Sequence, residues 1–377
     1  MKILVVTNIF ETTVNGPFYL PHWLLKINEL YPAHEVRVVT DDVTDSSEKI
    51  YKITIKHHRR LKNFASVLDN LPFYRACRRI KKEYDYNIVF FNVATLGALA
   101  SWLLPKNIKV WGVVHTDHYI LPDRRNYKSF KAYFYFAFLE HGLERAVIHS
   151  FDRIFFCSDY TRHVFEQFFP KPIPKMHTLL QTIDIKNMPF HPIPIRTDQI
   201  IKILFVKSDV LRGRIYILID ALALLSEYHF LLTIIGASHF LENDIRRYLE
   251  KSNAKNIQLD YRGAQSLSAV YAAMQSHQIL CMPVHSEALG LTNIEGLALG
   301  ISVVATNVGG IPQVMNNGKN CWLVEPDNVE SLRMGLKNCI ECPADERLEI
   351  QKNARLFVEQ YFDYREMLPY FTSFLED

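Results

Sequence analysis

The stretch that decides the fold is Ile279-Leu-Cys-Met-Pro-Val-His-Ser-Glu287-Ala-Leu-Gly290-Leu-Thr-Asn-Ile-Glu295-Gly-Leu-Ala-Leu-Gly300-Ile-Ser-Val-Val-Ala-Thr-Asn307-Val-Gly309-Gly310. Its two short apolar runs, 279–282 and 302–306, predict buried strands. Between them Gly290 marks a turn, and apolar residues at helical spacing predict a helix over 291–299 that ends at Gly300. A strand, a helix and a second strand make a βαβ unit, whose crossover implies a parallel sheet.

Two glutamates accompany this turn: Glu287 lies just before the predicted helix and Glu295 lies within it. Ligands of parallel sheets bind at the carboxyl ends of the strands, facing helix N-termini. The two carboxylates can hold two parts of one extended ligand, while the backbone N–H groups of Gly290 and Leu291 hold an anion between them. A sugar nucleotide has that layout. The simpler alternative is that Glu287 caps the helix and Glu295 is solvated.

The spacing Glu287-x7-Glu295, followed by Gly-Leu-Ala-Leu-Gly-Ile-Ser-Val-Val-Ala-Thr-Asn-Val-Gly-Gly-Ile-Pro, resembles the E-x7-E signature of glycosyltransferase family 4. That family consists of retaining enzymes with the GT-B fold. The resemblance implies an α/β protein with two Rossmann-like domains whose parallel sheets face a cleft. It implies that Glu287 is catalytic and contacts the donor sugar, that Glu295 holds the ribose, and that Gly290, Leu291 and Thr292 belong to the donor site.

Two cations follow the predicted strand 200–206, namely Lys207 and Arg212. Family members usually show Gly-Arg here and Lys-Gly five residues later, and the two cations clamp the donor diphosphate. This chain keeps both charges with their identities exchanged, although a guanidinium can bind two phosphate oxygens and an ammonium is a point charge. The alternative is that both are solvated loop cations. Gly263 lies where the nucleotide base of the family usually rests.

His115 directly follows the predicted strand 109–114. In the family a histidine at this position often contacts the donor sugar, and His118 is a second candidate; the alternative is a hydrogen-bonded loop histidine. The first loop, Asn15-Gly16-Pro17, has no G-x-G-x-x-G pattern, which argues against a nicotinamide-binding domain. The resemblance assigns Gly16 to the donor site.

Length and composition predict two soluble globular domains, because the chain has 377 residues, 49% hydrophobic and 22% charged. We expect an N-terminal acceptor-side domain over 1–190, a nucleotide-sugar-binding domain over 199–355, and a C-terminal helix over 356–377 that crosses back to the first. No apolar run reaches the roughly 18 residues of a membrane span. The start of the chain predicts a buried strand rather than a signal peptide.

The six cysteines are scattered and indicate reduced cytosolic thiols. The pair Cys339-x-x-Cys342 lacks the further ligands of a zinc site, and we expect neither a metal nor a cofactor beyond the nucleotide-sugar substrate. Charge is uneven: residues 1–195 carry 26 Lys and Arg against 18 Asp and Glu, net +8, which leaves −5 for the remainder of a chain whose net charge is +3. This asymmetry suggests an anionic surface as a partner of the first half.

The stretch 123–139 passes from basic residues to an aromatic run; its cations are Arg124, Arg125, Lys128 and Lys131. One interpretation is an interfacial segment in which cations meet lipid phosphates and aromatic rings enter the headgroup region. The other is a core helix with a solvated basic end. No nucleic-acid-binding module accompanies the charge. We therefore expect a cytoplasmic protein that is peripheral at the inner face of a membrane if the first interpretation holds.

The sequence thus predicts a metal-independent hexosyltransferase that moves a hexose, with retention, from a UDP- or GDP-sugar to a hydroxyl of a glycan or a lipid-linked acceptor. Two alternatives stay open. A GT-B sugar-nucleotide epimerase shares the architecture but uses different acid and base residues. A non-catalytic sugar-nucleotide-binding scaffold would account for the exchange of Lys207 and Arg212.

Overall fold

The computed structural model describes residues 1–10, 18–55, 68–115, 130, 148–169, 175–236 and 241–376. The chain divides into two compact units, one made of Met1–Thr182 with Tyr364–Asp377 and the other of Ile183–Asp363. The division therefore falls after Thr182, earlier than the expected boundary between 190 and 199.

The reason lies in the hydrogen bonds of the segment that follows Thr182. Ile183 forms a parallel bridge with Asp363. The Arg355 guanidinium donates to the carbonyl oxygens of Ile185 and Met188, each at 2.8 Å. These contacts attach the segment to the second unit.

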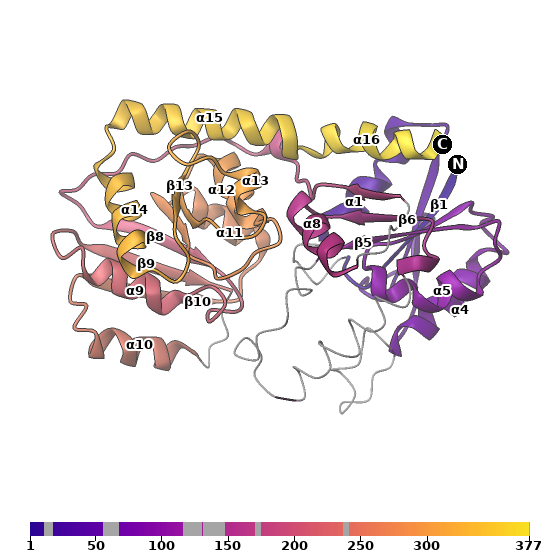
Figure 1. Cartoon of the computed structure of the whole chain (residues 1–377), viewed down its shortest axis with the longest axis horizontal. Helices are drawn as coiled ribbons and strands as arrows, with labels where there is room; N and C mark the ends of the chain where they lie inside the picture. The colour runs from indigo at the N-terminus through magenta and orange to yellow at the C-terminus, as the bar shows by residue number, and fades with distance from the viewer. Residues whose placement is uncertain are drawn as a thin grey trace. The chain divides into compact units, whose positions relative to one another are not determined.

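The first unit is a seven-stranded sheet with strand order β3-β2-β1-β4-β5-β6-β7, and all of its neighbouring pairs are parallel (Figure 1). Its first strand follows from the unbroken apolar run after Lys2, which is buried as a central parallel strand requires. In chain order its described elements are β1 (Lys2–Thr7), α1 (Tyr19–Leu25), α2 (Ile27–Leu30), β2 (Glu35–Thr40), β3 (Ile50–Lys52), α4 (Asn70–Ile80), β4 (Ile88–Phe91), η3 (Ala94–Gly97), α5 (Ala98–Leu103), β5 (Lys109–Val114), η6 (Ile148–Ser150), β6 (Arg153–Phe156), α8 (Asp159–Phe168), β7 (Met176–Thr178) and α16 (Tyr364–Glu376).

The last helix, α16, supplies part of the first unit's core. Tyr364 stacks on Trp23 with ring centroids 4.3 Å apart, and Phe371 meets Phe90 edge-on at 5.5 Å. The sequence predicted a single helix from 356 onward, but the chain instead breaks at Asp363, which lies between α15 and α16 in extended backbone. Helix α15 therefore belongs to the second unit and α16 to the first.

The second unit is a six-stranded sheet with strand order β10-β9-β8-β11-β12-β13, again with all neighbouring pairs parallel (Figure 1). Helix α12 spans the residues predicted from their spacing, and left-handed glycines lie at both of its ends. In chain order its described elements are η7 (Ile185–Asn187), β8 (Ile201–Val206), α9 (Ile215–Ala223), β9 (Phe230–Ile235), α10 (Glu242–Lys251), β10 (Ile257–Gly263), α11 (Leu267–Met274), β11 (Ile279–Met282), α12 (Leu291–Leu299), β12 (Ser302–Thr306), α13 (Ile311–Val314), β13 (Trp322–Val324), α14 (Val329–Glu341) and α15 (Ala344–Phe362).

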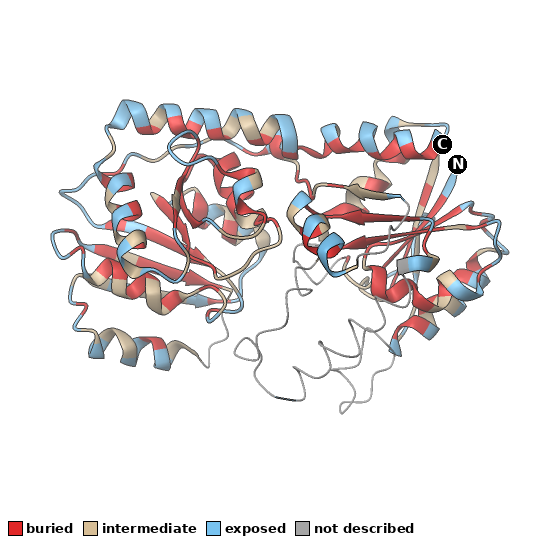
Figure 2. Cartoon of the chain, in the orientation of Figure 1, coloured by how far each residue is buried: buried red, intermediate tan, exposed pale blue. Residues whose placement is uncertain are grey.

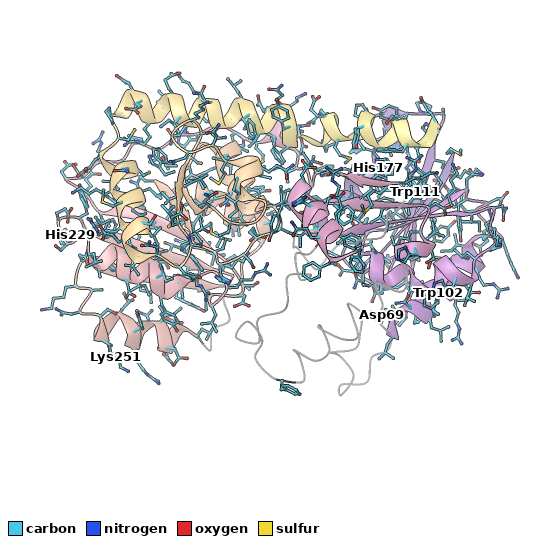
Figure 3. The ribbon with its side chains drawn as sticks, in the orientation of Figure 1. Asp69, Trp102, Trp111, His177, His229 and Lys251 are labelled. Carbon is cyan, nitrogen blue, oxygen red and sulfur yellow. The ribbon has the colours of Figure 1, made fainter. Side chains whose placement is uncertain are left out.

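Burial follows the layers within each unit. The central strands are buried, whereas the helices beside them carry exposed residues on one side (Figure 2). Two tryptophans of the first unit illustrate the contrast: Trp111 on β5 is fully buried and Trp102 on α5 is 50% exposed (Figure 3). Because both sheets are parallel, the loops that follow the strands of one sheet gather at one edge of it.

Candidate functional site

The clearest polar site of the second unit lies at the carboxyl ends of β8 and β11, which are neighbours in the sheet. Lys207 directly follows β8, and Glu287 lies in the loop between β11 and α12. The Lys207 ammonium meets a Glu287 carboxylate oxygen at 2.5 Å, across 80 residues of sequence. Both side chains are about one-fifth exposed. The sheet order therefore brings together two residues that the sequence assigned to different parts of one ligand.

Arg212, the second expected cation, is bound to the same loop as Glu287. Its carbonyl oxygen accepts the backbone N–H of His285 at 3.0 Å. Its Nε donates to the carbonyl oxygen of Ser286 at 3.3 Å. The β8–α9 loop and the β11–α12 loop are thus joined through Arg212 as well as through Lys207, which does not fit the alternative of two solvated loop cations.

The N-terminus of α12 begins beside Glu287. Gly290 precedes the helix in the left-handed region with φ of 90°, and no side chain among the described residues caps the helix end. Leu291 and Thr292 follow as its first two residues. Unsatisfied N–H groups at a helix start, together with the helix dipole, favour an anion. Glu287 does not cap the helix, since its carboxylate pairs with Lys207 instead.

A glycine pair holds the backbone of Glu287 in place. The Gly310 N–H donates to the Glu287 carbonyl oxygen at 3.0 Å. A β-carbon on Gly309 would lie 2.0 Å from that same oxygen, and one on Gly310 would lie 2.0 Å from the carbonyl oxygen of Ala288. Any side chain at either position would push the two loops apart. The Gly-Gly pair at the end of the deciding stretch is therefore a packing requirement of the Glu287 loop.

Glu295 is buried rather than solvated, with only 6% of its surface exposed. The Tyr271 hydroxyl donates to one of its carboxylate oxygens at 3.1 Å. Its burial excludes the alternative in which Glu295 is an ordinary solvated helix residue. Gly263 ends β10 with φ of 65°, and its carbonyl oxygen accepts the N–H of Gly236 at 2.7 Å. It therefore lies at the same strand edge of the sheet.

Three residues at this edge were missed by sequence reasoning. Asp327, in the loop between β13 and α14, binds Arg214 at 2.5 Å between Oδ1 and Nε, and His285 at 2.6 Å between Oδ2 and Nδ1. Burial raises the pKa of Asp327, but the hydrogen bonds from Arg214 and His285 outweigh it and hold the pKa below its usual value. The signal that could have found the cluster is weak, because each of its members is a single polar residue in a separate loop.

Asn293 was also missed. It lies in the first turn of α12, is only 3% exposed, and its Oδ1 has no hydrogen-bond partner among the described residues. Its Nδ2 lies 3.0 Å from the point that a β-carbon on Gly290 would occupy. A polar residue beside the apolar positions of the helix was the available signal. An unpaired buried polar atom is costly, so this amide next to the helix start is a candidate ligand contact.

Two family models match the chain. The model for Glycosyltransferase Family 4 matches residues 27–186, and the model for glycosyl transferases group 1 matches residues 191–357. The chain belongs to glycosyltransferase family 4. The two parallel-sheet units are the α/β architecture of GT-B glycosyltransferases, and this expectation from the sequence is confirmed.

Solved structures of GT-B glycosyltransferases cover this family 4 chain almost completely. Sucrose-phosphate synthase from Thermosynechococcus elongatus superposes with a TM-score of 0.80 at 16% identity, over 100% of this chain and 98% of that one. HepE from Anabaena, in complex with UDP-glucose, superposes with a TM-score of 0.73 at 16% identity, over 100% and 99%. At these identities the likeness shows the fold alone.

Curated relatives match over a shorter length. An uncharacterised glycosyltransferase from Methanocaldococcus jannaschii is 32% identical over 130 residues, which is 34% of this chain and 35% of that protein. The chain thus spans about a third or less of the length of the first curated relatives it matches. Among the described residues, no helix of this family 4 chain combines the length and the apolar character of a membrane span.

His115, in the first unit, has hydrogen-bond partners on both ring nitrogens. Its Nε2 meets the Asn92 carbonyl oxygen at 2.6 Å, and the Gln181 amide nitrogen meets its Nδ1 at 2.7 Å. Burial lowers the pKa of His115 to about 4. The ring is therefore neutral at physiological pH, with the proton on Nε2. Its contact with a donor sugar stays a prediction, as do the roles of Gly16 and His118, which lie outside the described residues.

Proposed function

We propose that the protein is a retaining glycosyltransferase that transfers a hexose from a UDP- or GDP-sugar to a hydroxyl of a glycan or glycolipid. The observation that carries this proposal is the pairing of Lys207 with Glu287 at 2.5 Å, beside the uncapped start of α12. A cation for the diphosphate, a carboxylate for the sugar and N–H groups for an anion lie together at one strand edge. The complex of HepE with UDP-glucose supports a nucleotide-sugar donor by analogy of fold.

In this proposal, binding of the donor breaks the ion pair between Lys207 and Glu287. The diphosphate pairs with the Lys207 ammonium, and the Glu287 carboxylate that this releases accepts hydrogen bonds from hydroxyls of the hexose. Glu295 holds the ribose, with Tyr271 fixing its carboxylate. Gly263, at the same edge of the sheet, leaves room for the base. The donor therefore extends from Glu287, past the N-terminus of α12, toward Glu295 and Gly263.

The chemistry requires stabilisation of a leaving diphosphate. Lys207, Arg212 and the N–H groups of Leu291 and Thr292 supply positive charge and hydrogen bonds there, so we propose that no metal and no cofactor is needed. The departing phosphate oxygen accepts the proton of the acceptor hydroxyl as the new glycosidic bond forms on the face that the diphosphate leaves. Retention of configuration follows from attack on that face.

The test is product analysis with radiolabelled UDP- and GDP-sugars, with and without a lipid extract as the source of acceptor. Transfer of the labelled sugar to an acceptor, with the anomeric configuration of the donor retained in the product, supports the proposal. Interconversion of the nucleotide-sugar without acceptor identifies the epimerase, and tight binding without turnover identifies the scaffold. Either of these results overturns the transferase.

We also propose that the acceptor is presented at an anionic membrane surface. The support is the charge split, +8 for residues 1–195 and −5 for the remainder, and the basic–aromatic stretch 123–139, which lies outside the described residues except for residue 130. Each Lys or Arg near such a surface contributes about 1 kcal/mol, within a Debye length. Sedimentation should show binding to anionic but not neutral liposomes, weakened when Arg124, Arg125, Lys128 and Lys131 are changed together to Ser. Equal and negligible binding to anionic and neutral liposomes at low salt would instead indicate a soluble acceptor.

A further inference from the structure

Left-handed backbone conformations at non-glycine residues are concentrated near the candidate site. Four described residues other than glycine have positive φ: Lys175, Arg214, Asn253 and Asp327. Two of them, Arg214 at 58° and Asp327 at 53°, form an ion pair with each other. A residue with a β-carbon is strained in this region, and such strain tends to persist where function requires it.

The stability of the fold does not explain this pair. The Asp327 side chain is 41% exposed and that of Arg214 is 28% exposed. Ion pairs at this level of exposure contribute little to folding, because water solvates and screens both charges. A glycine at 327 would adopt the same backbone without strain. The turn itself therefore does not account for a carboxylate at this position.

The contacts of the carboxylate indicate what that is. Asp327 follows β13, which is separated from β11 and β8 by β12. Its Oδ1 accepts from Arg214, on the loop after β8, and its Oδ2 from His285, on the loop after β11. One side chain thus joins the loops of three strands.

Arg212 is linked to both residues that Asp327 binds, Arg214 and His285. It is two positions before Arg214, and its carbonyl oxygen accepts the His285 N–H at 3.0 Å. Its guanidinium meets the carbonyl of Ser286, next to His285. Movement of either anchored residue would therefore displace Arg212. Burial raises the pKa of Asp327, but the hydrogen bonds from Arg214 and His285 outweigh it and lower the pKa, which keeps the carboxylate ionised at neutral pH.

We propose that Asp327 is a positioning residue that fixes Arg212 for the diphosphate of the donor, through Arg214 and His285. This inference rests on the proposed function, since it takes Arg212 as a diphosphate ligand. Asp327 itself does not touch the donor. A glycine would relax this backbone but would reach neither loop, whereas the Asp327 carboxylate reaches both.

The experiment separates the backbone from the carboxylate. Asp327→Gly removes both the strain and the carboxylate, and Asn253→Gly, at φ of 50°, is the matched control because it relieves strain in the second unit away from the site. Both variants should keep or raise the melting temperature. Asp327→Gly alone should weaken UDP and GDP binding about tenfold, as expected if the displaced Arg212 loses one charge-assisted hydrogen bond to the diphosphate, while uridine and guanosine binding changes less than about twofold. Asp327→Asn, which tolerates the same backbone, should weaken diphosphate binding less than Asp327→Gly does.

A double-mutant cycle tests the route. In an Arg212→Gln background, Asp327→Gly should have little further effect on UDP or GDP affinity. The proposal is overturned if Asp327→Gly binds UDP and GDP as the parent does, if it loses stability in step with affinity, or if its effect is unchanged without Arg212. Failure of the unaltered protein to bind either diphosphate is a different result, because it overturns the proposed function itself.

Discussion

The two units have the same construction, a parallel sheet with helices, but the polar groups at the ends of β8 and β11 differ in kind from the group at the end of β5. In the second unit the groups that meet are charged: Lys207 with Glu287, and Arg214 with Asp327. In the first unit the described polar group at the end of β5 is His115, a neutral ring held by a carbonyl and an amide. Opposite charges can be separated by a charged ligand, whereas a neutral hydrogen-bonded ring offers an anion nothing to exchange.

Sheet topology alone therefore does not determine what binds at a strand edge. Both edges have loops after parallel strands, where ligands of such sheets bind. What distinguishes them is the chemistry of the side chains that the strand order brings together. In the proposed function the groups after β8 and β11 bind a diphosphate, and the group at the end of β5 meets a neutral group such as a sugar hydroxyl. Three predictions test this distinction.

The largest effect is expected at Glu287. Glu287→Gln keeps the size of the side chain but removes the charge that pairs with Lys207, and transfer should fall about 10²- to 10³-fold, as for loss of one group that stabilises a transition state. Affinity for free UDP or GDP should stay the same or increase, because Lys207 is no longer held by a carboxylate. Turnover assays and titration calorimetry measure the two quantities.

Two other glutamates complete this test. Glu330→Gln serves as the control, since Glu330 pairs with Arg333 on an exposed helix face and should leave both quantities unchanged. Glu295→Ala should weaken free nucleotide binding by about 1.5–3 kcal/mol, for a lost charge-assisted hydrogen bond. Equal weakening by changes at Glu287 and Glu295 would refute the division between sugar and ribose contacts.

The next effect concerns the cations of the second edge. Lys207→Gln or Arg212→Gln should weaken nucleoside diphosphate binding by about 1.5–3 kcal/mol each and nucleoside binding much less. The matched control is Lys202→Gln, because Lys202 is exposed on β8, the strand that Lys207 follows. EDTA should leave transfer unchanged. A strict requirement for magnesium would show that these cations do not suffice for the leaving diphosphate.

The smallest effect is a pH dependence of stability that comes from the first edge. The pKa of His115 is about 4 in the folded chain, because burial disfavours the charged ring, and about 6.5 when unfolded. The unfolded chain therefore binds more protons between these values, and stability rises with pH across that window. From pH 5 to pH 7 the gain should be on the order of 2 kcal/mol.

Denaturant titrations of the parent and of His115→Gln at both pH values measure this contribution. The variant should show a smaller gain from pH 5 to pH 7 than the parent does, because glutamine does not titrate. His229→Gln is a control for replacement of a histidine in the second unit. Identical pH dependence in the parent and in His115→Gln would mean that the ring is not held neutral.

Much of the fold was predictable because it follows from local patterns. The first strand is buried as its apolar run predicted, and α12 has the bounds that its apolar spacing predicted, since both signals lie in consecutive residues. The unit boundary was not predictable in the same way. The boundary was expected between 190 and 199, but the deciding contact is the bridge between Ile183 and Asp363, which are 180 positions apart.

The candidate site shows the same contrast between local sequence patterns, which were predictable, and contacts between distant residues, which were not. Glu287, Glu295, Lys207 and Arg212 were predicted because family motifs place them in the loops that follow two strands or, for Glu295, in the helix after such a loop. Their pairing was not found, because it depends on β8 lying next to β11 in the sheet. Asp327 had only a weak signal, since its role depends on the loops of two other strands. Gln181 could not be connected with His115 for the same reason.

The order of assembly follows from the place of α16. Its side chains Met367, Phe371 and Phe374 belong to the core of the first unit, yet they are translated after every residue of the second. At roughly 5–20 residues per second, a ribosome needs about 10–40 s to make the intervening segment. During that time one apolar face of the nascent first unit has no covering helix, while the second unit is contiguous and can close as soon as it emerges. The half of the chain made first is therefore the half that finishes folding last.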